Sequence, residues 1–316
     1  MQNSSYFIEN RALFGCYPKQ RDVDELMKEG VRYFVNLTSF GENKIKPYVL
    51  SSSCKRINFP IRDHGVPRDW ETFSIFICKI SNIIATLQFP QKMYIHCRGG
   101  HGRAGLIVAI LLCHIFGMEP IEALKRTSYF HALRPNIKEK WKAIGSPHEY
   151  RQRAFVYRYF EPLNLYRLQY KNQFDSGFSR FSEHPFEVDG TRFICLESAL
   201  LHHFNQTLES PMKTIDFSTL TGKDAYSMRK YFTRQDATEW KKIRLGTLKR
   251  LMLLKFNQYP HISKKLRRSG FRTINMRARG NCTWPSGDGK NVTGEILMSI
   301  RKDLYSAPPS LKNGTR

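Results

Sequence analysis

The sequence predicts two domains: an α/β domain whose sheet is covered by helices, followed by a mainly helical α+β domain. Short apolar strand patterns alternate with helical patterns through residues 1–161, which indicates an α/β architecture. At Pro162 the pattern changes to aromatic-rich loops and short strands that precede several helices. A chain of 316 residues can bury two separate cores. We therefore expect domains at 1–161 and 162–306 and a flexible polar tail at 307–316.

The elements of the first domain follow from hydrophobic periodicity and from turn residues. Phe73, Ile77, Ile80 and Ile84 recur at helical spacing and predict one buried helical stripe. Pro147 suits the start of a helix. The expected strands are 13–15, 31–37, 56–61 and 93–95, and the expected helices are 22–28, 70–87, 106–116, 119–131, 137–144 and 146–160. Residues 38–53 are expected to form a loop with a short helix.

In the second domain, longer helical patterns dominate. The expected helices are 195–207, 218–234, 237–257 and 294–304, with a strand at 272–276 and a turn-rich loop at NCTWPSGDGKN. Trp240, Leu248 and Leu251 recur at helical spacing on one face of the expected helix. Trp240 could therefore pack in the core, as an alternative to a role in a binding site.

The net charge of +24 is the strongest compositional signal, and both predicted domains are basic. Such a field favours polyanionic partners, for which the candidates are RNA or DNA, anionic lipid surfaces and phosphorylated proteins. A generally basic surface without a single ligand is the alternative.

The seven cysteines show no C-x2-C pair, which favours reduced thiols and a cytoplasmic or nuclear location. We expect no metal site and no cofactor. The N-terminus lacks the pattern of a secretory signal. The apolar run at 106–116 is shorter than the roughly 20 residues that span a bilayer, so no transmembrane segment is expected.

The stretch YIHCRGGHGRAG places Cys97 and Arg103 between a predicted strand and a predicted helix. The loop amides and the helix N-terminus form an anion site that also favours the thiolate. Gly99, Gly100 and Gly102 allow close backbone approach to a ligand. Arg103 can bind two phosphate oxygens. The combination indicates nucleophilic attack on a phosphate ester.

Neighbouring residues refine this prediction. Arg98 and His101 add basic side chains to the phosphate loop, or are simply solvated. We expect His96 to orient Cys97 from outside the pocket. Asp63, in the loop DHGVP, could protonate the leaving oxygen, although a turn-capping carboxylate is the alternative.

HCRGGHGRAG and DHGVP together resemble the dual-specificity branch of the cysteine-dependent protein tyrosine phosphatases over about residues 8–160. The resemblance implies a central, mostly parallel sheet flanked by helices and a cysteinyl-phosphate intermediate. Cys97 would be the nucleophile, Arg103 the phosphate ligand and Asp63 the general acid. The usual Ser or Thr after the arginine is Ala104 here, so we expect slow turnover.

The implied substrates are proteins carrying phosphotyrosine, phosphoserine or phosphothreonine. Phosphoinositides are an alternative, because phosphoinositide phosphatases carry basic residues at the positions of Arg98 and His101. RNA 5′-triphosphatase activity is another, favoured by the net charge.

Residues 174–304 resemble the NADAR (NAD- and ADP-ribose-related) family in the blocks beginning FSRFSEHPFEVDG, EWKKIRLG and NCTWPSGDGK. The resemblance implies hydrolysis of N-glycosidic bonds in ribosylated nucleotides or ADP-ribosylated bases. The matching site residues are Glu197, Trp240, Trp284, Asp288 and Asn291.

Several positions depart from the NADAR pattern. Arg180 replaces an asparagine, residues 201–203 lack the usual glutamine and lysine, Pro285 replaces a glycine, and a glutamate is absent near Met276. We therefore expect a binder of nucleotides or ADP-ribose. A bifunctional protein whose main task is ADP-ribose or RNA-end processing is the alternative.

Overall fold

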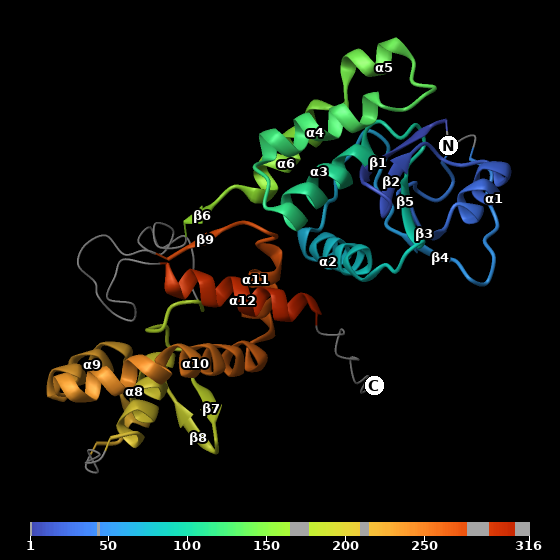
Figure 1. The fold of residues 1–316 in the computed structure, drawn as a ribbon. Helices are drawn as coiled ribbons and strands as arrows, with labels where there is room; N and C mark the ends of the chain where they lie inside the picture. The colour runs from blue at the N-terminus through green and yellow to red at the C-terminus, as the bar shows by residue number, and fades with distance from the viewer. Residues whose placement is uncertain (1, 43–44, 165–176, 209–214, 277–290, 307–316) are drawn as a thin grey trace. The chain divides into compact units, whose positions relative to one another are not determined.

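The computed structural model describes residues 2–42, 45–164, 177–208, 215–276 and 291–306. The chain forms two compact units: residues 1–161 together with 270–272, and residues 162–269 together with 273–316. Figure 1 shows the elements of each unit along the chain.

The first unit is built on a five-stranded sheet with strand order β1-β2-β5-β3-β4. The strands are β1 (Ser4–Ile8), β2 (Ala12–Gly15), β3 (Val31–Asn36), β4 (Lys55–Asn58) and β5 (Lys92–His96). Only the edge strand β1 pairs antiparallel, and the other neighbours are parallel. The predicted mostly parallel sheet is therefore confirmed.

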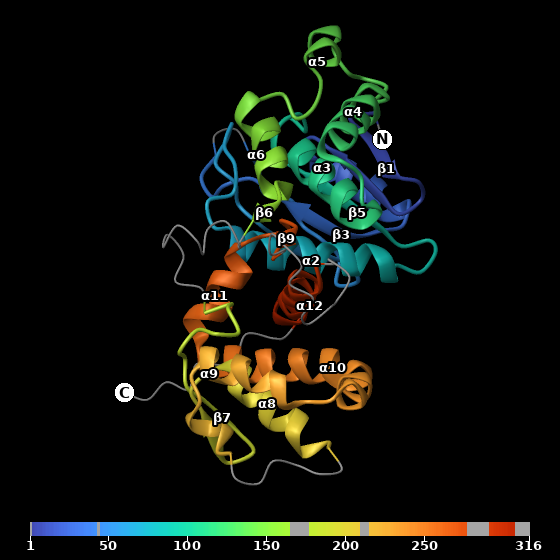
Figure 2. The same cartoon turned by 90° about the vertical axis from the view of Figure 1, so that its left-hand side faces the viewer.

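Helices cover both faces of this sheet, as Figures 1 and 2 show. They are α1 (Gln20–Lys28), α2 (Trp70–Thr86), α3 (Arg103–Phe116), α4 (Pro120–Ala132), α5 (Glu139–Ile144) and α6 (Tyr150–Phe160). Side chains alternate along each strand. Phe14 and Ile95 therefore join the core cluster that includes α2, α3 and α6, whereas Leu13 and Tyr94 pack with α1.

The central strand β5 sets the position of the predicted phosphate loop. Its residues Met93 to His96 are buried, and α3 behind it is buried along nearly its whole length. Because β2 and β3 run parallel to β5 on either side, the three carboxyl ends lie at one edge. The loop after β5 therefore starts at the edge where open α/β sheets bind ligands.

The second unit is mainly helical. Its helices are α8 (Leu196–Gln206), α9 (Gly222–Ser227), α10 (Arg234–Gln258), α11 (Pro260–Arg268) and α12 (Val292–Ser306), with 3₁₀ turns η1 (Phe217–Thr219) and η2 (Met228–Tyr231). Strands β7 (Phe186–Val188) and β8 (Thr191–Phe193) form a hairpin, and β6 (Leu163–Asn164) pairs with β9 (Ile274–Asn275). Trp240, Leu251 and Leu297 lie in its buried core.

Some sequence predictions of secondary structure are wrong. The expected helix at 218–234 is broken, because Asp216 and Thr221 each cap a new short helix. The helix expected from Ser146 begins at Tyr150, since Ser146 donates from Oγ to the His101 carbonyl oxygen instead. No helix occurs in the described part of 38–53.

Two elements were not predicted at all. β1 pairs with only one neighbour and begins with two serines, so its sequence lacks the apolar pattern that predicts a strand. α11 has only two apolar residues on its buried side, Ile262 and Leu266. No helix among the described residues is long and apolar enough to cross a membrane.

Candidate active site

The loop after β5 has Cys97 as its first residue and ends where α3 begins at Arg103. Gly102 is the N-cap of α3, so the free amides and the positive end of the helix dipole lie at the loop. Gly100 has a φ of +75°, and a Cβ there would lie 2.4 Å from the Gly15 carbonyl carbon. Glycine is therefore required at this position.

Cys97 is 3% exposed and lines a small pocket of about 40 Å³. The pocket is lined by Asp63, His64, Cys97, Gly99, His101, Gly102, Arg103, His148 and Gln152. Three segments far apart in the sequence supply these residues: the Asp63 loop, the loop after β5, and the region around the start of α6. The structure thus brings the three predicted catalytic residues to one pocket.

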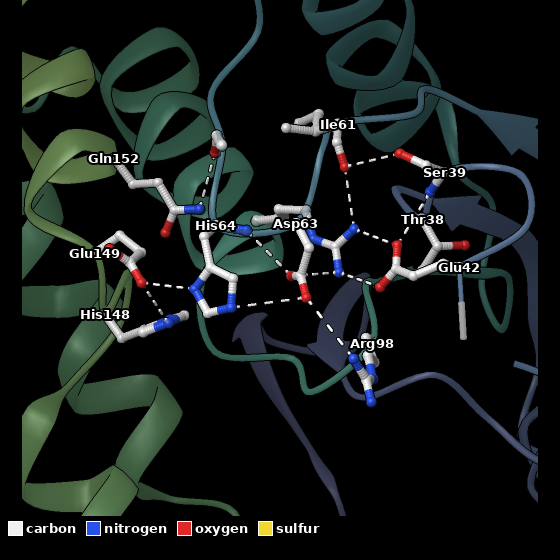
Figure 3. Close-up of polar contacts among 12 residues, drawn as sticks. Thr38, Ser39, Glu42, Ile61, Asp63, His64, Arg98, His148, Glu149 and Gln152 are labelled. Atoms are coloured by element: carbon white, nitrogen blue, oxygen red, sulfur yellow. Dashed lines mark hydrogen bonds and ion pairs between the residues drawn. The ribbon is translucent and has the colours of Figure 1, made fainter. Parts of the chain in front are cut away.

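The side chain of Arg103 is almost fully buried and is held by an acidic partner. Its Nη1 and Nη2 each donate to one Glu42 oxygen at 2.7 Å, and Nη1 also donates to the Ile61 carbonyl at 3.0 Å (Figure 3). Burial would lower the pKa of Arg103, but its bonds to Glu42 and nearby negative charges raise it above the ordinary value. The bidentate contact fixes the plane of the guanidinium.

Glu42 was not identified from the sequence, because it lies in a polar loop without any local motif. A buried cation requires an anionic partner. That requirement predicts an acidic residue beside Arg103, but the sequence does not indicate which one.

Asp63 lies against the same guanidinium. Its Oδ1 is 2.9 Å from Arg103 Nη2, and its Oδ2 is 3.9 Å from Arg98 Nη1. Its side chain is 39% exposed, so it is open to solvent while it lines the pocket with Cys97. The carboxylate therefore contacts the two arginines that would bind phosphate.

The Asp63 loop is attached to the start of α6 by two side chains. His64 Nδ1 lies 2.6 Å from Glu149 Oε1, and Gln152 Nε2 donates to the Gly65 carbonyl at 2.9 Å (Figure 3). Gln152 is fully buried, and its Oε1 has no hydrogen-bond partner among the described residues. Because Gln152 lines the pocket, this oxygen can accept a hydrogen bond from a bound water. No local sequence motif marks Gln152 as a site residue.

His96 is fully buried behind the loop. Its Nε2 lies 2.8 Å from the Tyr48 hydroxyl, and the Tyr17 and Tyr94 rings pack against it. Burial, followed by the charge of Arg56, lowers the pKa of His96 to about 3. A neutral imidazole in this position supports the end of β5 and is no proton donor or acceptor for substrate.

His101 differs from the expectation that it adds positive charge. Its Nδ1 lies 2.7 Å from His131 Nε2, and its ring stacks on Trp141 at 4.2 Å. Burial, then the charges of Arg134 and His148, lower the pKa of His101 to about 4. The ring is therefore neutral near pH 7, and its stacking shapes the loop.

Arg98 and Ala104 differ in their exposure to solvent. The Arg98 side chain is 46% exposed and close to Asp63, so it can reach a substrate. Ala104 is fully buried in the main core, and its methyl group offers no hydroxyl to Cys97.

In the second unit, Glu197 is fully buried at the start of α8. Its Oε2 lies 3.1 Å from Arg180 Nη1, and its Oε1 accepts from Arg229 Nη2. Arg180 is one of the residues that depart from the NADAR pattern. Glu197 therefore lies between two cationic side chains in a buried ion cluster.

The other second-domain candidates that the structure describes, Trp240 and Asn291, have structural contacts of their own. Trp240 is 2% exposed and stacks on Phe204 in the core. Asn291 donates to the Ile274 carbonyl and accepts from the Met276 amide, which fixes β9. Trp284 and Asp288 lie outside the described residues.

Comparisons with known proteins match both units. Residues 5–155 match the family described as "Swiss Army Knife protein, DSP-PTPase phosphatase domain" (PTP-SAK), and residues 168–305 match the NADAR domain. The first range contains Asp63 and the whole loop from Cys97 to Arg103, and the second contains Glu197.

Similar proteins match different lengths of this chain. "Putative tyrosine phosphatase 197R" of Invertebrate iridescent virus 6 is 30% identical over 94% of this chain and 90% of its own length. "Putative tyrosine phosphatase 067L" of Invertebrate iridescent virus 3 is 35% identical over 51% of this chain and 66% of its own. The crystal structure of Tk-PTP in the active form is 24% identical, covering 46% of this chain and 95% of its own, with a TM-score of 0.36. The chain belongs to the PTP-SAK family of tyrosine and dual-specificity phosphatases, which are hydrolases, and carries a NADAR domain after its phosphatase domain.

Proposed function

We propose that this phosphatase hydrolyses phosphate monoesters in two steps through a cysteinyl-phosphate intermediate. The observation that carries the proposal is the convergence of Cys97, Arg103 and Asp63 on one pocket. In the first step the Cys97 thiolate forms an S–P bond while the P–O bond to the leaving group breaks, and Asp63 gives its proton to the leaving oxygen. In the second step water attacks phosphorus, the S–P bond breaks, and the Asp63 carboxylate takes the proton.

The electrostatics of the pocket fit this sequence. Arg103 and the amides at the start of α3 stabilise the charge that develops on the equatorial phosphate oxygens. Glu42 holds the guanidinium in place before substrate arrives, so little reorganisation is needed. Since Asp63 occupies one face of Arg103, an incoming phosphate replaces that contact and leaves Asp63 beside the leaving group.

Gln152 is the residue best placed to orient water in the second step. Its amide nitrogen is fixed on the Gly65 carbonyl, and its oxygen lies at the pocket without a described partner. An acceptor held in this way can direct one hydrogen of a water molecule and turn its lone pair toward phosphorus.

We propose phosphotyrosine, phosphoserine and phosphothreonine in proteins as substrates. The catalytic pocket is small, and the half-exposed Arg98 side chain lies beside Asp63, which lines the pocket; both features suit a phosphate on an accessible side chain. His101 is neutral, so the loop carries less charge than a site for highly phosphorylated ligands would use. Phosphoinositides and triphosphorylated RNA ends are therefore the weaker alternatives.

We propose that the NADAR domain binds a nucleotide or ADP-ribose group. Glycosidase chemistry needs a carboxylate near the anomeric carbon, but Glu197 is buried between Arg180 and Arg229. Cys16, Cys54, Cys97, Cys113 and Cys195 form no disulfide, which supports our proposal of a cytoplasmic or nuclear location.

The proposals are tested with the full chain and with Cys97→Ser and Glu197→Ala variants. An aryl phosphate, phosphopeptides, phosphoinositides, triphosphorylated RNA and ADP-ribosylated nucleic acid serve as substrates. We expect phosphate release from the aryl phosphate and phosphopeptides that is lost in Cys97→Ser, and a phosphoenzyme that can be trapped by acid quenching. Phosphate release that survives Cys97→Ser would overturn the mechanism.

For the second unit, release of ADP-ribose that depends on Glu197 would show that this domain is a glycosidase and not only a binder. We expect that the parent chain binds ADP-ribose without releasing it from nucleic acid, and that Glu197→Ala loses this binding.

A further inference from the structure

Two imidazoles and a carboxylate meet at the mouth of the catalytic pocket. His64 Nδ1 lies 2.6 Å and His148 Nε2 lies 3.2 Å from the same oxygen of Glu149. Figure 3 shows the three side chains together, between the Asp63 loop and the start of α6. Within the described ranges, they form the one group of three His, Cys, Asp or Glu residues whose potential metal-ligand atoms all lie within 4.8 Å of one another.

The spacing of these atoms is close to that of a zinc site. Zinc binds imidazole nitrogen at about 2.0–2.1 Å and carboxylate oxygen at about 2.0–2.2 Å, so tetrahedral ligands lie roughly 3.3 Å apart. Small side-chain rotations would bring His64 and Glu149 from their hydrogen bond to that separation. Imidazole ligands favour zinc over magnesium or calcium, which prefer all-oxygen sites.

The surroundings hold the ligands in place. The His148 ring packs edge-on against Trp141, and its Nδ1 faces Gly102, where an added Cβ would lie 2.8 Å away. His64 has a φ of +58°, an uncommon backbone conformation outside glycine that turns its side chain toward Glu149. The side chains of His148 and Glu149 are 17% and 28% exposed, so an ion can reach them from solvent.

We propose that His64, His148 and Glu149 form a binding site for one zinc ion that ties the Asp63 loop to the start of α6. Three protein ligands leave a fourth position for water, as in open zinc sites. His64 belongs to the loop, whereas His148 and Glu149 immediately precede α6, so the ion would link two segments that are 84 residues or more apart in sequence. Bound zinc would hold the loop over the pocket.

The binding test uses the full chain carrying Cys97→Ser, which removes the pocket thiolate as a competing ligand. Zinc is titrated by calorimetry into this protein and into versions that also carry His64→Asn, His148→Gln or Glu149→Gln. We expect each of the three to lose one zinc equivalent or to bind it at least about tenfold more weakly. His261→Gln removes an exposed histidine of the second unit and should change nothing.

The use of three separate variants guards against the misfolding of any one of them. Asn tolerates the backbone conformation of His64, and Glu149→Gln keeps a hydrogen-bond acceptor. Hydrogen exchange provides a second measurement. Zinc should increase the protection of the amides at 62–66 in the Cys97→Ser parent and not in the three variants, and magnesium should have no effect.

Equal zinc binding in all variants, or unchanged amide protection at 62–66 in the Cys97→Ser parent, would overturn the proposal. Neither measurement depends on catalysis, so a failure here is distinguishable from a failure of the phosphatase mechanism.

Discussion

Replacing Asp63 by Asn should have opposite effects on catalysis and on anion binding. Asp63 is the proposed proton donor, and its carboxylate also contacts Arg103 at 2.9 Å in the free protein. Asn has nearly the same size and cannot donate a proton of comparable acidity. We therefore expect kcat for phenyl phosphate to fall by about 10²- to 10³-fold. An aryl phosphate whose phenoxide leaves without protonation should be affected much less.

The same substitution removes a negative charge that competes with phosphate for Arg103. Arg103 is buried, but Asp63 is 39% exposed, so the pair belongs near the upper end of solvent-exposed ion pairs, about 1 kcal/mol. A contact of that strength corresponds to roughly a fivefold change in affinity. Inorganic phosphate should therefore bind about fivefold more tightly to Asp63→Asn.

The assays are steady-state kinetics with leaving groups of different basicity, and calorimetric titration of phosphate into Cys97→Ser with and without Asp63→Asn. Asp24→Asn, an exposed carboxylate on α1, is the matched control and should change neither quantity. An equal loss of kcat with good and poor leaving groups would refute the acid role. Weaker or unchanged phosphate binding would refute the competition for Arg103.

Three further predictions follow from the structure. Ala104→Ser should speed hydrolysis of the phosphoenzyme by about fivefold, because a hydroxyl hydrogen bond worth about 1 kcal/mol would stabilise the departing thiolate; rapid-quench kinetics that show a slower second step would contradict it. Glu42→Gln should lower the free energy of unfolding by about 2 kcal/mol, since Arg103 loses a charged and buried partner; urea unfolding measures it, and an unchanged midpoint and slope would argue against it. His96 has a pKa of about 3 when folded and an ordinary value of 6.5 when unfolded, so its own contribution to stability, present above pH 6.5, should fall by about 2 kcal/mol between pH 7 and pH 5. Urea unfolding at both values tests this, and a His96→Gln variant with the same pH slope as the parent would exclude His96 as the cause.

The sequence predicted most of the sheet and the reacting groups, because these depend on local patterns. The strand ending at His96, the glycines of the loop and the helix from Arg103 follow from residues adjacent in the chain. The same reasoning failed for β1 and α11, where few apolar residues lie on the buried side and pairing with distant segments decides the structure.

The charge of His101 could not be predicted from its position in the loop. Its neutrality comes from burial and from the charges of Arg134 and His148, and the ring also stacks on Trp141, which lies 40 residues later in the chain. Likewise, the role of Glu197 depends on Arg180 and Arg229, whose side chains reach it only in the folded unit.

The sequence by itself determined that Cys97, Arg103 and a glycine-rich turn form an anion site between a strand and a helix, since backbone geometry and residue chemistry are local properties. Only the tertiary structure decided which distant side chains complete it. Glu42 binds Arg103, Gln152 offers a free oxygen, and Glu149 meets two histidines at the mouth of the pocket. These contacts join segments far apart in the chain, and the packing of the loops against α3 and α6 is what brings them within hydrogen-bonding distance.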